Sequence, residues 1–292
     1  MAGFSLRKKI RSTDVITLYY LIITALYMLL FDGFSGVTKA GLLFRTGVIV
    51  VMVSIVWLEA WKKSRITYAI HLLYPILLLS FFYGETASVN HFIFKVNLDS
   101  SIFDLEQSLF GFQPSIEFSK RFPQKWIGEL LYFGYFSLYL MTAAVCLVFI
   151  IKKPQIAERI IFIILTSFLI YYLIFIIFPV VGPQYFLQPP LNEMNDTGIF
   201  SWAVKQVQYY GEKPTGAMPS SHVGMVLIYL HLSFKNIRWL FWIILPLFIL
   251  IVLATVYIKA HYAIDVIAGI VSAPVIYIIS KALFRLVKVS SN

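Results

Sequence analysis

The chain has 292 residues, of which 60% are hydrophobic and only 13% are charged. A soluble globular domain carries about a quarter charged residues, so this composition excludes an ordinary soluble protein. The formal net charge of +10 is compatible with a nucleic-acid partner, but long apolar runs with few charges are typical of membrane-spanning helices.

Eight apolar runs follow one another along the chain. Backbone amides find no partner in hydrocarbon, so each run that crosses a bilayer must be helical. The first run follows the basic segment RKKIR, but its apolar core of 17 residues is long for a signal sequence and no A-x-A site follows, which predicts an uncleaved span. The sequence therefore predicts an all-α, polytopic integral membrane helical bundle, with spans at roughly 15–31, 42–61, 66–83, 130–151, 160–178, 220–234, 238–258 and 262–283.

The basic residues lie mostly on one side of the bilayer if the chain alternates across eight spans from a cytoplasmic N-terminus. Inner segments then carry 15 of the 24 basic residues against three acidic residues, a net +12, and outer segments carry nine basic against eleven acidic residues, a net −2. This is the asymmetry of the positive-inside rule. We therefore expect both termini in the cytoplasm, and the basic charge gives no reason to expect a nucleic-acid partner.

Two of the predicted outer loops are long. The first, from Gly84 to about Glu129, holds DLEQSLFGFQPS, whose apolar and acidic residues recur at helical spacing and predict one or two interfacial helices. The second, from Pro179 to Pro219, holds GPQYFLQPP, whose prolines predict a structured loop that is too stiff for a helix. We expect a single membrane domain, with residues 1–128 as an accessory layer and residues 129–292 as the catalytic core.

The segment PSSH opens the sixth apolar run. Pro219 suits the first turn of a helix, and the hydroxyls of Ser220 and Ser221 can satisfy free amides there. A helix start presents unpaired N–H groups and a partial positive charge, which together bind phosphate. His222, in that first turn, can protonate a leaving oxygen as a general acid. The alternative is an ordinary N-cap with a histidine at the membrane interface.

The segment HYAID opens the last apolar run. His261 and Asp265 are four residues apart, so their side chains share one face of a helix. A carboxylate that accepts from one ring nitrogen fixes the tautomer and raises the basicity of the other nitrogen, which makes an effective nucleophile or base. The alternative is a histidine–aspartate pair that satisfies only itself at the membrane edge.

Together these elements place both histidines at the same, outer face of the membrane, which is periplasmic or lumenal by the charge distribution. The segments GAMPSSHVG and VYIKAHYAIDVIAG resemble the second and third signature motifs of the type 2 phosphatidic acid phosphatase superfamily. The resemblance implies that His261 attacks phosphorus to form a phosphohistidine, that Asp265 orients it and that His222 protonates the leaving group. The substrate is then expected to be a lipid phosphate or a phospholipid.

The chain departs from that superfamily's pattern in its basic residues. The first motif, a lysine followed seven residues later by Arg-Pro, is missing, and Thr255 stands where an arginine is expected before the third-motif histidine. Lys213 is the best remaining cation for a phosphate, with Lys259 second. Alternatively, Lys213 is a solvated loop residue and Lys259 an interfacial one. The predicted phosphate-binding residues are therefore Lys213, Ser220 and Ser221.

Two loop segments point to one branch of the superfamily. DLEQSLFG and FPVVGPQYF look like loops of inositol phosphorylceramide synthases and their bacterial relatives, although Gln184 stands where arginine is often found. Such enzymes pass a phosphoryl headgroup to a lipid alcohol instead of to water. The sequence leaves both reactions open.

Two further classes of function stay open at this point. A lipid transporter or scaffold with the same fold and no chemistry is favoured by the missing basic motif. A metal-dependent hydrolase would use His222, His261 and Asp265 as zinc ligands, but the usual His/Cys-rich ligand set is missing from the sequence. We therefore expect no metal and no cofactor.

Overall fold

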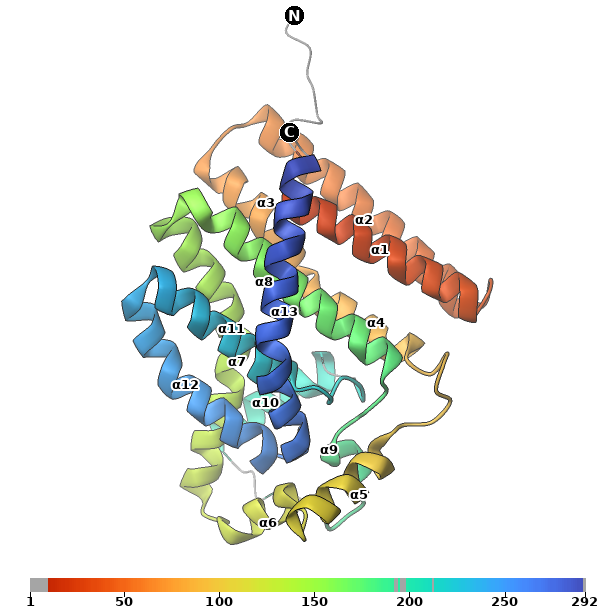
Figure 1. Cartoon of the computed structure of the whole chain (residues 1–292), viewed down its shortest axis with the longest axis vertical. Helices are drawn as coiled ribbons and strands as arrows, with labels where there is room; N and C mark the ends of the chain where they lie inside the picture. The colour runs from red at the N-terminus through yellow and green to blue at the C-terminus, as the bar shows by residue number, and fades with distance from the viewer. Residues whose placement is uncertain (1–9, 192–193, 195–197, 212, 291–292) are drawn as a thin grey trace, which may run out of the picture. The chain divides into compact units, whose positions relative to one another are not determined.

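The structure, a computed structural model, describes residues 10–191, 194, 198–211 and 213–290 (Figure 1). Three of the basic residues that indicate a cytoplasmic N-terminus, Arg7, Lys8 and Lys9, lie outside the described residues. Within them the chain forms the helices α1 (Ser12–Phe31), α2 (Gly36–Trp61), α3 (Arg65–Leu77), α4 (Leu79–Val89), α5 (Asp99–Phe110), α6 (Pro114–Arg121), α7 (Lys125–Lys152), α8 (Pro154–Ile177), α9 (Pro183–Phe186), α10 (Ile199–Gly211), α11 (Ser221–Asn236), α12 (Arg238–Tyr257) and α13 (Ala263–Ser290).

The predicted all-α, multi-pass membrane architecture is confirmed. Among the described residues, seven helical segments are long and apolar enough to cross a membrane: α1, α2, α3 with α4, α7, α8, α12 and α13. The predicted sixth span is the helix α11, which has only 16 residues. At 1.5 Å per residue it is about 24 Å long, shorter than the hydrocarbon core of about 30 Å.

The chain forms two compact units. Unit 1 comprises Met1–Phe81, Ala143–Leu169 and Ile278–Asn292, and unit 2 comprises Phe82–Thr142 and Ile170–Tyr277. The helices α4, α7, α8 and α13 contribute residues to both units. The division into an accessory layer of residues 1–128 and a catalytic core of residues 129–292 stays a prediction about function.

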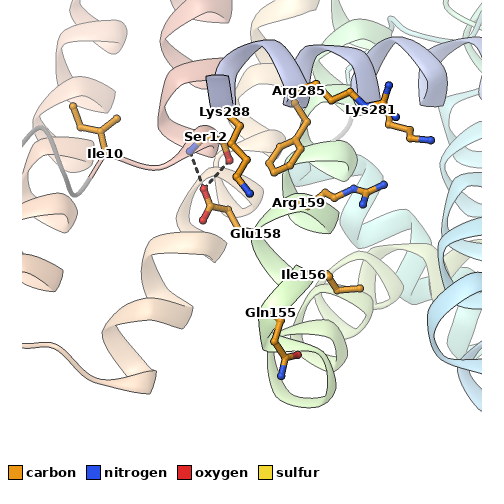
Figure 2. Close-up of a pocket in the computed structure, with 10 residues that line it drawn as sticks. Ile10, Ser12, Gln155, Ile156, Glu158, Arg159, Lys281, Arg285 and Lys288 are labelled. Carbon is orange, nitrogen blue, oxygen red and sulfur yellow. Dashed lines mark hydrogen bonds between the residues drawn. The ribbon is translucent and has the colours of Figure 1, made fainter. Parts of the chain in front are cut away.

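In unit 1, the first residues of α1 and the last turns of α13 line the same cavity (Figure 2). Ser12 begins α1 and Ile10 lies two residues before it, and Arg285 and Lys288 belong to the end of α13. The beginning of the first apolar helix and the end of the last one therefore lie together.

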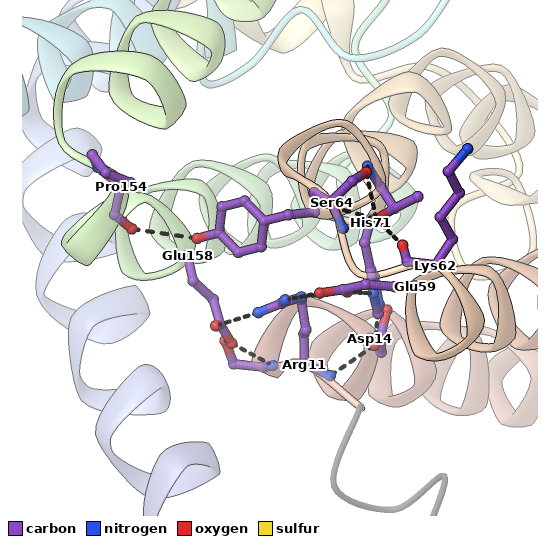
Figure 3. Close-up of polar contacts among 11 residues, drawn as sticks. Arg11, Asp14, Glu59, Lys62, Ser64, His71, Pro154 and Glu158 are labelled. Carbon is purple, nitrogen blue, oxygen red and sulfur yellow. Dashed lines mark hydrogen bonds and ion pairs between the residues drawn. The ribbon is translucent and has the colours of Figure 1, made fainter.

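A network of buried and half-buried charges ties α1, α2, α3 and α8 together in unit 1 (Figure 3). The guanidinium of Arg11 pairs with the carboxylates of Glu59 and Glu158. The ring of His71 lies between Glu59 and Asp14, with Nε2 2.8 Å from Oδ2 of Asp14. A charge among membrane helices is costly unless it is paired, so this network fixes how the four helices meet.

Unit 2 has a core that supports the segment before α13. The buried residues come from α7, α10, α12 and the turn after α12, and they are Leu131, Tyr132, Tyr135, Val204, Ala254, Tyr257, Ile258 and Ala260. Because Ala260 belongs to this cluster, the residue immediately before His261 is anchored in the core.

The first long loop forms the helices α5 and α6, where one or two helices were predicted. One face of α5 is buried, with Asp99, Ile102 and Glu106 at intervals of three and four residues. A helix that lay only on the membrane surface would keep such carboxylates in water, so α5 is part of the packed structure of unit 2.

The second long loop is structured, as predicted, but it also contains helix. Pro183 begins the single turn α9, a position where a proline loses no hydrogen bond. Gly182 has a φ of +87°, and a Cβ atom there would lie 2.5 Å from the carbonyl oxygen of Ala260. The amide of Gln184 donates to the carbonyl oxygen of Lys259 at 2.7 Å. The loop therefore packs directly against the residues that precede His261.

The helix α10 was not predicted from the sequence. Its first amides, those of Phe200 and Ser201, donate to the carboxylate of Glu129 at 2.9 and 3.0 Å. Glu129 belongs to α7, so the group that caps this helix comes from a distant segment.

Candidate active site

His222 lies in the first turn of α11. Ser220 is the N-cap, and its hydroxyl accepts a hydrogen bond from the amide of Val223 at 3.4 Å. The amide of Ser220 donates to the backbone carbonyl of Asp265 at 2.9 Å. Ser220 and Ser221 are both buried, so the start of α11 is held against the start of α13.

Two backbone amides at the start of α11 remain available. Within residues 213–290, the N–H groups of Ser221 and His222 have no hydrogen-bond partner. These groups carry the partial positive charge of a helix start. They are suitable donors to a phosphate oxygen.

His261 lies in the turn between α12 and α13, and the residue is only 2% exposed. Its amide donates to the carbonyl oxygen of Thr255 at 2.9 Å, and Lys259 adopts a φ of +63° in the same turn. Thr255 therefore helps to shape the turn that carries the histidine, at the position where the superfamily pattern has arginine.

The two histidines lie side by side. Nε2 of His261 is 3.2 Å from Nδ1 of His222, and the ring centroids are 5.2 Å apart. The structure thus brings together the two residues that the sequence predicts to share one membrane face.

The hydrogen bonds of His261 determine its tautomer. Nδ1 of His261 is 2.7 Å from the carbonyl oxygen of Ala217, and a carbonyl oxygen only accepts, so Nδ1 carries the proton. Nε2 of the neutral ring then has a lone pair, to which Nδ1–H of His222 donates. The nitrogen that faces His222 is therefore the nucleophilic one.

Asp265 faces the protonated nitrogen of His261. Its Oδ2 lies 3.5 Å from Nδ1 of His261 and accepts a shorter hydrogen bond, of 2.9 Å, from the amide of Tyr262. Its Oδ1 is buried and has no hydrogen-bond partner among the described residues. Asp265 thus lies where it favours positive charge on His261, whereas the carbonyl of Ala217 makes the shorter contact.

The two candidate cations lie in different environments. Lys213 is exposed, and its side chain makes no hydrogen bond or ion pair within the described residues. Lys259 is only 3% exposed and lies two residues before His261. The phosphate-binding role of Lys213, Ser220 and Ser221 stays a prediction.

Asp99 supports the site from α5. Its carboxylate accepts from the amides of Val181 and Gly182, both at 2.9 Å, and from the hydroxyl of Tyr262 at 3.2 Å. The carbonyl of Val180 in turn accepts from the amide of Ala217 at 3.0 Å. A chain of hydrogen bonds therefore connects α5 to the carbonyl group that fixes His261. Burial raises the pKa of Asp99, and its hydrogen bonds oppose this effect.

Glu106 supports the site one turn further along α5. Its Oε1 accepts from the amides of Ala263 and Ile264 at 2.6 and 3.3 Å, so it caps the start of α13. Its Oε2 is buried without a hydrogen-bond partner among the described residues. Burial, and to a lesser degree the charge of Asp265, raise the pKa of Glu106 to about 7.

Tyr135 packs against the ring of His222. The two rings stack with centroids 4.7 Å apart and an interplanar angle of 22°. Asp99, Glu106 and Tyr135 were not among the predicted site residues, because each lies far along the chain from the histidine that it supports. The signal in the sequence was limited to Glu106, which lies in the segment predicted to be a surface helix, whereas Asp99 lies before that segment.

A metal site does not emerge from the side-chain arrangement. In the described part of the chain, no group of three or more His, Cys, Asp or Glu side chains is arranged to hold a metal ion. Whether the site works without a metal stays a prediction that a chelator tests.

One comparison with known proteins gives a match. The family model of the PAP2 superfamily matches residues 100–279, which is more than half of the chain and includes α5 after its first residue, both histidines and Asp265. No curated protein and no solved structure matches the chain.

Proposed function

The chain belongs to the PAP2 superfamily, and from that premise we propose that it is a membrane-embedded lipid phosphatase or lipid phosphotransferase that works through a phosphohistidine at His261. The superfamily generally comprises phosphatases and phosphotransferases. The observation that carries the proposal is the 3.2 Å contact of His261 Nε2 with His222 Nδ1, because it places a lone pair and a proton donor at one point.

In the first step, the lone pair of His261 Nε2 attacks phosphorus, and the bond from phosphorus to the leaving oxygen breaks. A phosphate anion that enters between the rings favours a second proton on His222. The doubly protonated ring then gives a proton to the leaving oxygen and becomes neutral. The hydrogen bond between the two rings opens when the phosphate enters, since phosphorus occupies the place of the shared proton. The phosphorylated ring of His261 is positively charged, and the carboxylate of Asp265 stabilises that charge.

In the second step, water or a lipid hydroxyl attacks phosphorus and the P–N bond breaks. Neutral His222 takes the proton of the attacking group and regains its doubly protonated form. His261 is released with its lone pair restored. The same residues thus serve a phosphatase and a transferase, and only the acceptor differs.

The phosphate oxygens are proposed to lie at the start of α11. The amides of Ser221 and His222 supply two donors, and the hydroxyls of Ser220 and Ser221 border them. We propose Lys213 as the cation that replaces the missing basic motif, with Lys259 as the second candidate. Replacing each lysine separately by Met and measuring KM distinguishes them. Only the replacement of the lysine that binds phosphate should raise KM.

The acceptor separates hydrolysis from headgroup transfer of the inositol phosphorylceramide synthase type. The resemblance of the loop around Gly182 to that branch favours a lipid alcohol. Gln184, at a position that is often arginine in the branch, accepts a hydrogen bond from Gln208 at 3.0 Å. The contact between Gln184 and Gln208 carries no charge, unlike an arginine at this position. Because this difference weakens the resemblance to the branch, we propose headgroup transfer and hydrolysis as two alternative reactions.

We propose that both termini are cytoplasmic and that the site faces the periplasm or a lumen. The start of α1 and the end of α13 meet at one cavity, which supports an even number of crossings. The number is even when the short helix α11 is counted together with the seven longer spans. A cysteine placed at Lys213 should react in intact cells with a membrane-impermeant maleimide, and one at Lys288 should not. The native Cys146 is buried, so it gives little background labelling.

The experiment that tests the function uses purified protein in vesicles, with EDTA throughout. The lipids are phosphatidic acid, an isoprenyl diphosphate and phosphatidylinositol, each with and without ceramide or diacylglycerol. Phosphate release that His222→Ala and His261→Ala both lose supports the phosphatase. A new phospholipid that forms only with a lipid alcohol supports the transferase.

Three results would contradict the proposal. Turnover that survives both substitutions excludes the phosphohistidine. Turnover that EDTA abolishes indicates a metal-dependent hydrolase. Lipid transport by His261→Ala at the wild-type rate, with no turnover by the wild type, indicates the transporter or scaffold.

A further inference from the structure

A second charged site lies in unit 1, at the cavity where α1 begins, α8 begins and α13 ends (Figure 2). Its volume is about 400 Å³, within the range of roughly 300–1,000 Å³ for small-molecule sites. Four cationic side chains line it, Arg159 from α8 and Lys281, Arg285 and Lys288 from α13, against one acidic side chain, Glu158. The lining therefore carries a net charge of +3.

The one carboxylate at this cavity already has partners. Glu158 accepts hydrogen bonds from the amide and the hydroxyl of Ser12, at 3.0 and 2.8 Å, and it pairs with Arg11 at 3.1 Å. By contrast, the four cationic side chains make no hydrogen bond or ion pair within the described residues. The positive charge of the cavity is therefore not neutralised by the part of the chain that the structure describes.

The remaining lining is apolar. Ile10, Ile156 and Phe284 contribute to the same cavity, and Ile156 and Phe284 belong to helices that are apolar enough to cross a membrane. A ligand there meets cations and hydrocarbon side chains together, at the ends of membrane-spanning helices. A free anion matches only the cations, whereas a phospholipid matches both.

We propose that this cavity binds the phosphate headgroup of an anionic phospholipid. The lipid belongs to the leaflet in which α1 begins and α13 ends. The cations contact the phosphate, and Ile156 and Phe284 contact the first part of an acyl chain. Basic pockets between membrane helices bind anionic headgroups in this way. The positive-inside rule alone requires cations near the ends of spans, but it does not require them to converge on one cavity.

The inference does not depend on the proposed function. The cavity is lined by residues 10–12, 155–159 and 281–288, and none of the candidate catalytic or phosphate-binding residues belongs to these ranges. A protein without catalytic activity would still bind the lipid here.

The test uses phosphatidylcholine vesicles that contain a phosphatidylglycerol with a photoreactive acyl chain. After irradiation, labelled peptides are identified by mass spectrometry. Label is expected on the peptides that carry Ile156 and Phe284. In the triple variant Arg159→Gln, Lys281→Gln, Arg285→Gln, this label should fall by at least about tenfold, because each cation near a lipid surface contributes about a fivefold preference for anionic lipid.

A matched control removes the same charge elsewhere. The triple variant Lys62→Gln, Lys63→Gln, Arg65→Gln changes three exposed cations, two between α2 and α3 and one at the first residue of α3. They lie at the same end of unit 1, since the hydroxyl of Tyr68 donates to the carbonyl of Pro154 at the start of α8. Labelling of Ile156 and Phe284 should be unchanged in this variant.

Three outcomes overturn the proposal. Equal loss in both triple variants indicates a diffuse effect of surface charge. No label at Ile156 or Phe284 excludes a lipid in the cavity. Competition by millimolar glycerol 3-phosphate indicates a soluble phosphate ligand instead of a lipid.

A charge-conserving variant, Arg159→Lys, Lys281→Arg, Arg285→Lys, keeps the test decisive if the first variant folds poorly. It should melt at the wild-type temperature and retain the label. Loss of the label in this folded, equally charged variant also contradicts a site that recognises charge.

Discussion

The backbone carbonyl of Ala217 accepts a 2.7 Å hydrogen bond from Nδ1 of His261. The loop that leads to one proposed catalytic histidine therefore fixes the proton of the other. Because Nδ1 is protonated, the lone pair of Nε2 points toward His222, where it is available to phosphorus once a phosphate separates the rings. The proposed chemistry depends on this coupling of two segments.

If His222 acts as a general acid, the fall in kcat caused by His222→Ala should depend on the leaving group. With a lipid alcohol as leaving group, His222→Ala should reduce kcat by about 10²- to 10⁴-fold, the range for general acid catalysis. With p-nitrophenyl phosphate the loss should be much smaller, because nitrophenolate leaves without a proton. His261→Ala should abolish turnover of both substrates, and equal losses for both variants on both substrates would contradict the assignment.

Asp265 is predicted to act through its charge. The carbonyl of Ala217 already holds the tautomer of His261, so Asp265→Asn should leave that tautomer and KM unchanged. Its kcat should fall by at least about tenfold, because the phosphorylated ring loses its counter-charge. Steady-state kinetics on vesicle-bound substrate measure both constants. A change in KM alone would place Asp265 in substrate binding instead.

Glu106 is predicted to make stability depend on pH. Its pKa is raised to about 7 from an ordinary value of 4.5, so between these pH values the folded protein binds a proton that the unfolded chain has lost. The free energy of unfolding should therefore fall as pH rises from about 5 to 7. Above that range the stabilising contribution of the bound proton is fully lost. Glu106→Gln keeps an acceptor for the amides of α13 and should flatten the dependence.

Thermal unfolding of the wild type and Glu106→Gln at a series of pH values measures this effect. Glu117→Gln is the control that removes a carboxylate elsewhere, at a half-exposed residue of α6 that pairs with Lys120. A change that both variants share is not specific to Glu106. An identical dependence in Glu106→Gln would mean that Glu106 is not the titrating group.

Gly182 is predicted to tolerate no side chain. A Cβ atom there would lie 2.5 Å from the carbonyl of Ala260, and its φ of +87° disfavours other residues. Gly182→Ala should lower the free energy of unfolding by about 1–3 kcal/mol and reduce activity, because the turn before His261 must shift. Gly47→Ala, at a helical position with open space, should not lower the free energy of unfolding, because alanine is favoured over glycine inside a helix. Equal melting temperatures for the two variants would contradict this account.

The sequence predicts well what short-range spacing determines. The apolar runs define the membrane helices, and the spacing of four residues places Asp265 beside His261. The sequence predicted that His222 and His261 lie at the same membrane face, but it did not predict their direct contact, which the structure gives. The helices follow from hydropathy, whereas His261 lies in the turn before α13, so the four-residue spacing acts across the start of the helix instead of within it.

The supporting residues escape prediction because their partners are distant in sequence. Asp99 accepts from amides more than eighty residues away, and Glu106 caps a helix that begins more than one hundred and fifty residues later. The helix α10 was missed for the same reason, since its cap is Glu129 of α7. No local pattern identifies such tertiary caps.

The central claim is that phosphate is carried on His261, and the most direct test is to trap it. The protein is mixed with a ³²P-labelled lipid phosphate, quenched rapidly in alkali, digested and analysed by mass spectrometry. The account predicts an acid-labile, alkali-stable phosphate on the peptide that contains His261, present in the wild type and missing from His261→Ala. Phosphate on another residue, or turnover without any phosphorylated peptide, would contradict the account.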